Sequence, residues 1–157
     1  MPRLRPVDLD FVRTAPRHHV NEAIVPAPIS RVFGAVSGDP SGWRDWFPGF
    51  SSGHYEGASG VGAVRVVKYQ GTTFRETILA WDEPSRWTFR VDSSTVPIAN
   101  ALIEDWTFED APGGTLARWT FNVEPNLLGR LIAPAQLRVM SRIFQRAMRN
   151  LGGQLSR

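Results

Sequence analysis

Apolar and polar residues alternate along the middle of the chain, from Phe50 to Glu124. An alternation of period two is typical of strands that bury one face. Clusters of Gly, Pro, Asp and Ser interrupt it near positions 57–60, 70–72, 82–85, 93–97 and 110–114, which divides the region into six strands. Because these interruptions are short, neighbouring strands are expected to pair antiparallel. The segment His18–Val25 predicts one further strand before this series.

Two short helical segments are predicted between the first strand and the series. Pro26 and Pro28 precede a helix that begins at Ile29 and buries the side formed by Val32, Phe33 and Val36. Ser41 is expected to cap a second helical turn, which carries Trp43, Trp46 and Phe47. We interpret this tryptophan turn, residues 43–47, as a hydrophobic plug that closes the fold; a gate at a cavity mouth is the alternative.

A long amphipathic helix is predicted from Leu127 to Leu151. Pro134 interrupts it once, and the pair Gly152-Gly153 is expected to end it. Its apolar residues form a broad face that should pack on the sheet. They are Leu128, Leu131, Ile132, Ala135, Val139, Met140, Ile143, Phe144, Ala147 and Leu151.

This order of elements predicts an α+β domain. A sheet with one solvated face must bury its other face, so the seven antiparallel strands should curve around the long C-terminal helix. The two short helices follow the first strand. Residues 17–157 are expected to form a single ligand-binding domain, and residues 1–16 an N-terminal extension.

The composition is that of an ordinary folded domain. Apolar residues make up 42% of the 157 positions and charged residues 21%, which excludes intrinsic disorder. The absence of cysteine excludes disulfides and thiolate metal sites, and it fits a reducing compartment. No apolar run is long enough to span a bilayer, and the first residues lack a signal-peptide core. We therefore expect a cytoplasmic protein without integral membrane association.

The net charge of +3 is small, and Lys68 is the only lysine. This balance does not predict nucleic-acid binding. Arg138, Arg142 and Arg146 recur at a spacing of four in the last predicted helix and share one stripe, with Arg149 close by. We interpret the stripe as a solvated helix face; contact with phosphates or anionic lipid is the alternative.

Strand alternation selects the residues that face the concave side of the sheet. Trp87 and Phe89, for example, face inward because their alternates are polar. A two-residue turn at Gly71-Thr72 would set Tyr69 opposite Phe74. The result is an aromatic cavity that carries a few charges. Its predicted ligand-binding residues are Arg65, Tyr69, Phe74, Glu76, Trp87, Phe89, Glu104, Trp106, Trp119, Phe121, Met140 and Phe144.

The charged residues of these rows are the candidates for chemistry. Glu76 and Glu104 stand in otherwise apolar rows, and Arg65 lies in the neighbouring row. A carboxylate that faces a cavity must be hydrogen-bonded, paired or protonated. The group either orients a polar end of a ligand or supplies a general acid or base, which makes both glutamates candidate catalytic residues. We favour a structural role for these residues over a catalytic one. Glu76 could form an ion pair with Arg65, or a strand bulge could turn either glutamate to solvent.

Three stretches of the chain resemble a known protein family. They contain the first strand with its helix pair, the tryptophan turn, and the hairpins that include glycine. They are VPAPISRVF (25–33) with DP (39–40) and WRDWFPG (43–49), GVGAVR (60–65) with ETILAWDEP (76–84), and GGT (113–115) leading to Trp119. Through them residues 17–152 are similar to the START-related helix-grip (SRPBCC) superfamily, in particular its bacterial polyketide cyclase/dehydrase-like branch.

The resemblance implies a helix-grip fold around an apolar cavity. It implies a small hydrophobic ligand, such as a lipid, a polyketide or another ring-bearing molecule, held as by a carrier. It also implies an alternative, a polyketide aromatase/cyclase in which Glu76, Glu104, Arg65 and Tyr69 orient a poly-carbonyl chain and move protons. A protein-binding module is a third hypothesis, which no apolar surface patch evident in the sequence supports.

No cofactor is predicted. The three histidines, His18, His19 and His54, are too scattered to predict a metal site, and we interpret them as surface residues. The expected partner is the small hydrophobic ligand alone, bound by a monomer or a homodimer.

Overall fold

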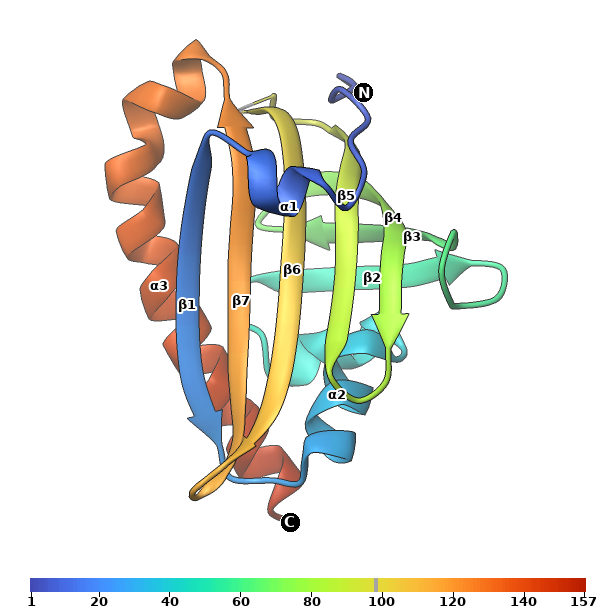
Figure 1. The fold of residues 1–157 in the computed structure, drawn as a ribbon, viewed down its shortest axis with the longest axis vertical. Coiled ribbons are helices and arrows are strands. Elements are labelled where there is room, and N and C mark those ends of the chain that lie inside the picture. Colours follow the sequence, from blue (N-terminus) through green and yellow to red (C-terminus); the bar gives the residue numbers. More distant parts are fainter. Residues whose placement is uncertain (98) are drawn as a thin grey trace.

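One antiparallel sheet curves around a long helix (Figure 1). The computed structural model describes residues 1–97 and 99–157. The strands are β1 (Arg17–Val25), β2 (Phe50–Glu56), β3 (Val64–Tyr69), β4 (Thr72–Asp82), β5 (Arg86–Ser94), β6 (Ala99–Ala111) and β7 (Gly114–Pro125). The helices are α1 (Phe11–Thr14), α2 (Ile29–Ser37), the 3-10 helix η1 (Pro40–Asp45) and α3 (Leu127–Leu155). The spatial order β1-β7-β6-β5-β4-β3-β2, with α2 and η1 after β1, confirms the predicted helix-grip architecture.

The aromatic core lies between the concave face of the sheet, the short helices and the C-terminal half of α3. Trp43 is at its centre, with its ring centroid 4.8 Å from that of Trp46 and 5.8 Å from that of Trp106. Its indole Nε1 donates a hydrogen bond to the carbonyl of Val36 at 2.9 Å, which satisfies the polar atom of the buried ring. The tryptophan turn is therefore packed into the core, as a plug would be.

Two details of the predicted turns are wrong. Asp39 rather than Ser41 caps η1, because the Asp39 carboxylate accepts a hydrogen bond from the Ser41 amide at 2.9 Å. The β3–β4 turn is Gln70-Gly71, one residue earlier than predicted, so Tyr69 pairs with Thr72. Both turn residues have positive φ, 47° and 78°, which is the conformation that two-residue hairpins of type I′ require. The inward rows of both strands are unchanged by this shift.

The long helix continues past the pair of glycines that was expected to end it. Gly152 is buried against Pro26, and a Cβ atom there would lie 2.7 Å from the proline Cδ. A glycine at this position lets the helix approach the β1–α2 connection closely, so it serves packing rather than termination. At the other end of α3, Asn126 accepts a hydrogen bond from the Gly129 amide and donates one to the carbonyl of Pro97. None of the helices in the described part of the chain is both long enough and apolar enough to cross a membrane.

The convex face of the sheet is only partly solvated, contrary to the expectation of one open face. Residues 1–16 run across it, and Figure 1 shows α1 lying over β6 and β7. Phe11, Val7 and Ala15 form a second core with Ala101 and Ile103, whose side chains point away from the cavity. The side chains of β6 alternate as the sequence predicts, but this N-terminal strap, residues 1–16, buries outward apolar positions of β6 that the pattern alone assigns to solvent.

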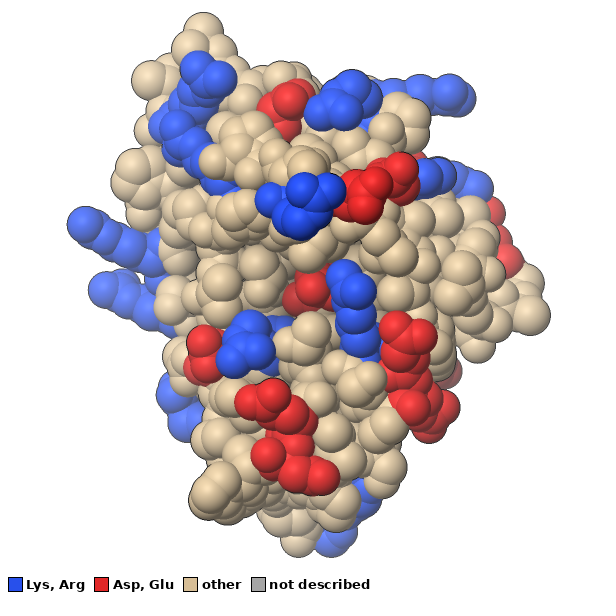
Figure 2. All heavy atoms as spheres, viewed as in Figure 1, with Lys and Arg blue, Asp and Glu red and all other residues tan. Residues whose placement is uncertain are grey.

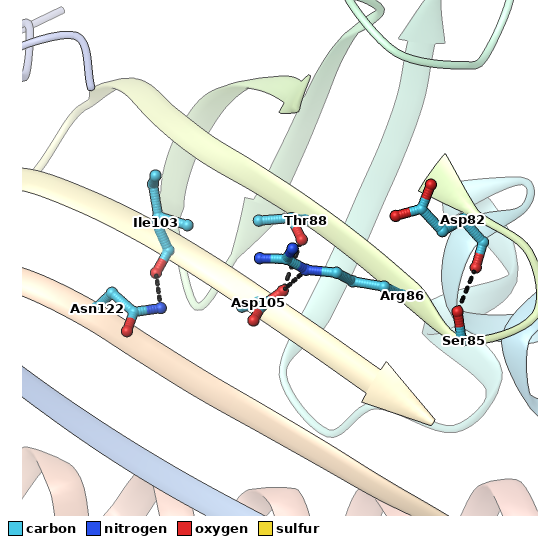
Figure 3. Close-up of polar contacts among 7 residues, drawn as sticks. All are labelled: Asp82, Ser85, Arg86, Thr88, Ile103, Asp105 and Asn122. Carbon is cyan, nitrogen blue, oxygen red and sulfur yellow. Dashed lines mark hydrogen bonds and ion pairs between the residues drawn. The ribbon is translucent and has the colours of Figure 1, made fainter. Parts of the chain in front are cut away.

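Polar residues below the strap satisfy one another on the same face. Asp105 accepts hydrogen bonds from the Arg86 guanidinium at 2.9 Å and from the Thr88 hydroxyl at 2.6 Å (Figure 3). Asn122 is fully buried and contacts the carbonyl of Ile103 and the ring of His18. Charged side chains of both signs surround this region (Figure 2). The cluster is internally paired and holds adjacent strands together.

Candidate functional site

A cavity of about 510 Å³ lies between the concave face of the sheet and the N-terminal half of α3. Its volume is in the range of small-molecule binding sites. Strands β3 to β7 supply most of the wall, β1 contributes the rim residues Arg17 and His19, and η1 with the following turn contributes Trp43 and Phe47. The tryptophan turn thus packs into the core and also forms part of the cavity wall.

Nine of the twelve predicted ligand-binding residues line this cavity. They are Arg65, Tyr69, Phe74, Glu76, Phe89, Glu104, Trp119, Phe121 and Met140. The other three, Trp87, Trp106 and Phe144, are fully buried in the aromatic core and do not reach the cavity wall. Alternation identified the inward side of each strand, but it carries no information on how deep each residue lies.

His19 was interpreted as a surface residue, and the structure places it at the cavity rim instead. Counting back by twos from the buried Val25 would have assigned it to the inward row of β1. Partial burial and the neighbouring Arg17 lower the pKa of His19, so its imidazole is neutral around pH 7. The rim there presents a neutral hydrogen-bonding ring beside a permanent positive charge.

The floor of the cavity holds a buried ion pair. Arg65 on β3 and Glu76 on β4 are directly paired across the ladder, and their side chains meet at 2.8 Å between Nη1 and Oε2. Their side chains are 2% and 5% exposed, so the pair is removed from solvent. Burial raises the pKa of Glu76 to about 7, while the positive charge of Arg65 opposes that rise. The ion pair that we favoured over catalysis is present.

Aromatic rings surround the Arg65 guanidinium on its remaining sides. Its Cζ lies 4.7 Å from the ring centroid of Trp43, 5.0 Å from that of Trp87 and 5.5 Å from that of Phe89. Such rings stabilise a buried cation through their negative faces. The Nε atom of Arg65 nevertheless has no hydrogen-bond partner among the described residues. This donor is itself buried, so it is an unsatisfied polar atom of the floor rather than a group exposed to the cavity.

Glu104 lies on β6, near this pair, and is not part of an ion pair within residues 1–97 and 99–157. Protein atoms surround it, and only the cavity gives access to part of its side chain. Burial raises the pKa of Glu104 to about 8, and the negative charge of Glu76 adds to the rise. Arg65 and the indole of Trp119 oppose it but do not cancel it. At neutral pH Glu104 is thus mainly a carboxylic acid, which can donate a hydrogen bond into the cavity.

Tyr69 is a further polar residue of the cavity, on the side nearest α3. Its hydroxyl lies 3.9 Å from the sulfur of Met140 on α3, and burial together with Glu104 raises its pKa to about 12. The phenol therefore stays protonated. The cavity combines an apolar aromatic wall with three neighbouring polar groups: a carboxylic acid, a phenol and a paired guanidinium.

The half of α3 that covers the cavity is much less buried than predicted. Leu128, Leu131 and Val139 were expected to pack on the sheet, but they are 48%, 74% and 50% exposed. The fully buried apolar side chains of the helix, among them Phe144, Ala147 and Leu151, are all in its second half. Leu128 and Leu131 do not line the cavity and lie toward the solvent side of the helix, whereas Val139 lies at the cavity edge.

Solved structures with the same fold are found among plant and microbial proteins. Ara h 8.0201 is 17% identical with a TM-score of 0.67, and the match covers 88% of this chain and 97% of that one. The ginseng major latex-like protein 151 from Panax ginseng is 16% identical with a TM-score of 0.67, over 88% and 96% of the two chains. The di-domain aromatase/cyclase BexL of the BE-7585A biosynthetic pathway is 17% identical with a TM-score of 0.69, over 87% of this chain and 49% of BexL. At these identities the likeness shows the fold alone.

The sequence itself carries the family assignment. A search of curated protein sequences finds no match. The sequence profile of one family, described as polyketide cyclase/dehydrase and lipid transport, matches residues 17–155, from the first residue of β1 to the last residue of α3. The chain therefore belongs to the polyketide cyclase/dehydrase and lipid transport family.

Proposed function

We propose that this protein binds a small, ring-bearing apolar molecule in its cavity and holds it as a carrier does. The observation that carries the proposal is the cavity of about 510 Å³, whose apolar wall surrounds one compact group of polar side chains. Ligand sites of this kind obtain affinity from apolar contact and orientation from a few polar groups. Phe74, Phe89, Trp119 and Phe121 supply flat surfaces that suit a ring system.

The polar group defines the ligand further. A protonated Glu104 donates a hydrogen bond into the cavity, so the matching ligand atom is an oxygen that accepts it, as in a ketone, ester or phenol. A fully ionised ligand group is less suitable beside Glu76, which is itself an acid. The proposed ligand is therefore apolar overall and carries at least one accepting oxygen.

Native mass spectrometry of freshly purified protein tests the proposal by detecting a co-purified small molecule. In parallel, an environment-sensitive apolar dye should bind the folded protein saturably, and the co-purified molecule should displace it. Glu104→Gln keeps a donor at the same place, so its binding should weaken by only about 1 to 2 kcal/mol. Glu109→Gln, an exposed change on the same strand, should leave binding unchanged. Absence of saturable binding to the native protein would contradict the proposal.

An acid/base reaction of the aromatase/cyclase kind is the second candidate. Glu104 favours it, because its carboxyl group makes no ion pair with the residues that the structure describes and its pKa of about 8 suits proton transfer near neutral pH. In that case Glu104→Gln would leave the affinity for a poly-carbonyl substrate nearly intact and reduce turnover by about a hundredfold or more. Measuring affinity and product formation on the same variant distinguishes a carrier from a cyclase.

A further inference from the structure

The outward face of α3 changes character along its length. Leu127 and Leu131, 75% and 74% exposed, lie on the same stripe as Arg138, Arg142 and Arg149, because their spacing alternates between four and seven residues. The first turns of the helix thus expose leucines, and the following turns expose arginines. In Figure 2 basic side chains project on the left, where Figure 1 places α3.

The exposed leucines belong to a larger apolar patch at the cavity mouth. Val96, in the β5–β6 loop, is 44% exposed, and the Asn126 side chain ties that loop to the start of α3. Ile132 and Val139 are both exposed to solvent and part of the cavity lining. Large exposed apolar residues gathered in this way mark an interaction surface. This mouth patch consists of Val96, Leu127, Leu128, Leu131, Ile132 and Val139.

The charged residues of α3, beside the mouth patch, are all positive. Residues 127–157 contain six arginines and no Asp or Glu, so a net charge of +3 for the whole chain leaves −3 for residues 1–126. The salt bridges of the described residues include none with an arginine of α3. Cations with no acidic neighbours on their own helix are available to an anionic partner.

We propose that α3 docks the protein on an anionic lipid bilayer, with the mouth patch in the interfacial region and the arginines on the lipid headgroups. Apolar side chains beside clustered basic ones are the features of a helix that lies on a membrane without crossing it. Docking in this orientation sets the cavity mouth against the bilayer, from which an apolar ligand enters without passing through water.

A second copy of the chain is a poorer occupant of the same face. A two-fold contact between two α3 helices brings the same stripe of each together. Because that stripe contains no acid, arginines of one copy would face leucines or arginines of the other. Anionic headgroups, by contrast, complement both parts of the stripe.

Co-sedimentation with lipid vesicles tests the proposal on the full-length protein, without any cavity ligand. The wild type should bind vesicles of phosphatidylcholine mixed with phosphatidylglycerol, bind phosphatidylcholine alone much more weakly, and dissociate as salt is raised. Arg138→Gln with Arg142→Gln should reduce partitioning about 10- to 30-fold. Leu127→Ser with Leu131→Ser should reduce it roughly tenfold or more.

Matched variants elsewhere should bind as the wild type does. Arg13→Gln with Arg44→Gln removes the same charge from exposed positions outside α3, and Val20→Ser with Val61→Ser removes apolar side chains that are 52% and 68% exposed. Thermal unfolding confirms that each variant is folded. The proposal is overturned if the wild type ignores anionic vesicles, if the control variants lose as much binding as the α3 variants, or if sedimentation shows that the leucine variants separate a dimer.

Discussion

Charges on the cavity floor are compensated in different ways. Arg65 has a carboxylate partner and three aromatic rings, whereas Glu104 is kept from charging by its surroundings. A buried ion that has a partner is tolerated, while one that loses its partner is strongly destabilising. The stability of the floor therefore depends on which single group is changed.

Removing the acid of the buried pair should show this dependence. Glu76→Gln leaves the Arg65 charge buried without its counter-charge, and we expect a loss of about 3 to 5 kcal/mol in the free energy of unfolding. Glu56→Gln breaks the pair with Arg75, which is 2.6 Å long but about two-fifths exposed, and should lower stability far less because solvent screens an exposed pair. Urea denaturation measures both. Equal losses would mean that the buried pair contributes no more than the surface one.

Glu104 predicts a pH dependence of stability. Its folded pKa, about 8, is above the ordinary value of 4.5, so between these values the folded state binds more protons than the unfolded state. Stability should therefore fall as the pH rises, by on the order of 1 to 3 kcal/mol between about pH 5 and about pH 9. In Glu104→Gln this decline should be smaller, and in Glu109→Gln it should be unchanged. Denaturation midpoints across that range check the prediction; a decline of the same size in Glu104→Gln would contradict it.

Among the elements, α3 shows most clearly which structural information an apolar sequence pattern carries and which it lacks. Its apolar periodicity predicted a helix, and the strand alternation predicted the sheet with its inward rows, including Glu76 and Glu104. Periodicity reports that a face is apolar, but not whether protein atoms lie opposite it. The predicted apolar face includes both Leu131 and Phe144, yet Leu131 is 74% exposed on the outward side of the helix and Phe144 is fully buried. Depth in the fold depends on contacts between distant segments, which spacing alone does not encode.

The adjacent glycines near the end of α3, Gly152 and Gly153, provide a matched test of close packing. Gly152→Ala places a methyl group 2.7 Å from Pro26, and we expect it to cost about 1 to 3 kcal/mol in stability. Gly153→Ala meets no atom within 4 Å and gains helix propensity, so it should stabilise by roughly 0.5 to 1 kcal/mol. Opposite signs in thermal or chemical unfolding support the assignment. A stabilising Gly152→Ala would show that the helix has room to move away from the proline.

At the scale of the whole molecule, the N-terminal strap makes the sheet a shared wall between two cores. Arg3 bridges to Ser93, and the amides of Leu4 and Arg5 donate hydrogen bonds to carbonyls of Asp92 and Asn100. No local signal in residues 1–16 indicated this. Their apolar residues follow neither the helical nor the strand periodicity, and the residues that they contact are far along the chain. The sequence therefore predicted the concave side of the sheet better than its convex side.

Phe11 is the anchor of the strap, since it is 7% exposed against Ala101 and Ile103. Phe11→Ala should lower stability by about 1 to 3 kcal/mol, less than a central core substitution because the strap can detach locally. Arg13→Ala, exposed on the same helical turn, should cost less than about 0.5 kcal/mol. Hydrogen exchange of residues 1–16 would locate the change. Unaltered exchange in Phe11→Ala would refute the anchoring role.

The sheet is open: β1 and β2 are its outermost strands, and α3 lies across the concave side between them. A closed barrel has a fixed bore, because strand number and shear set its diameter. Here one side of the container is a helix held firmly at its C-terminal half and loosely at its N-terminal half. A small tilt of α3 changes the bore without breaking any hydrogen bond of the strand ladder. We therefore expect the cavity wall to be mechanically compliant, so that a bulkier ligand would be accommodated by elastic displacement of α3 rather than by rearrangement of the sheet.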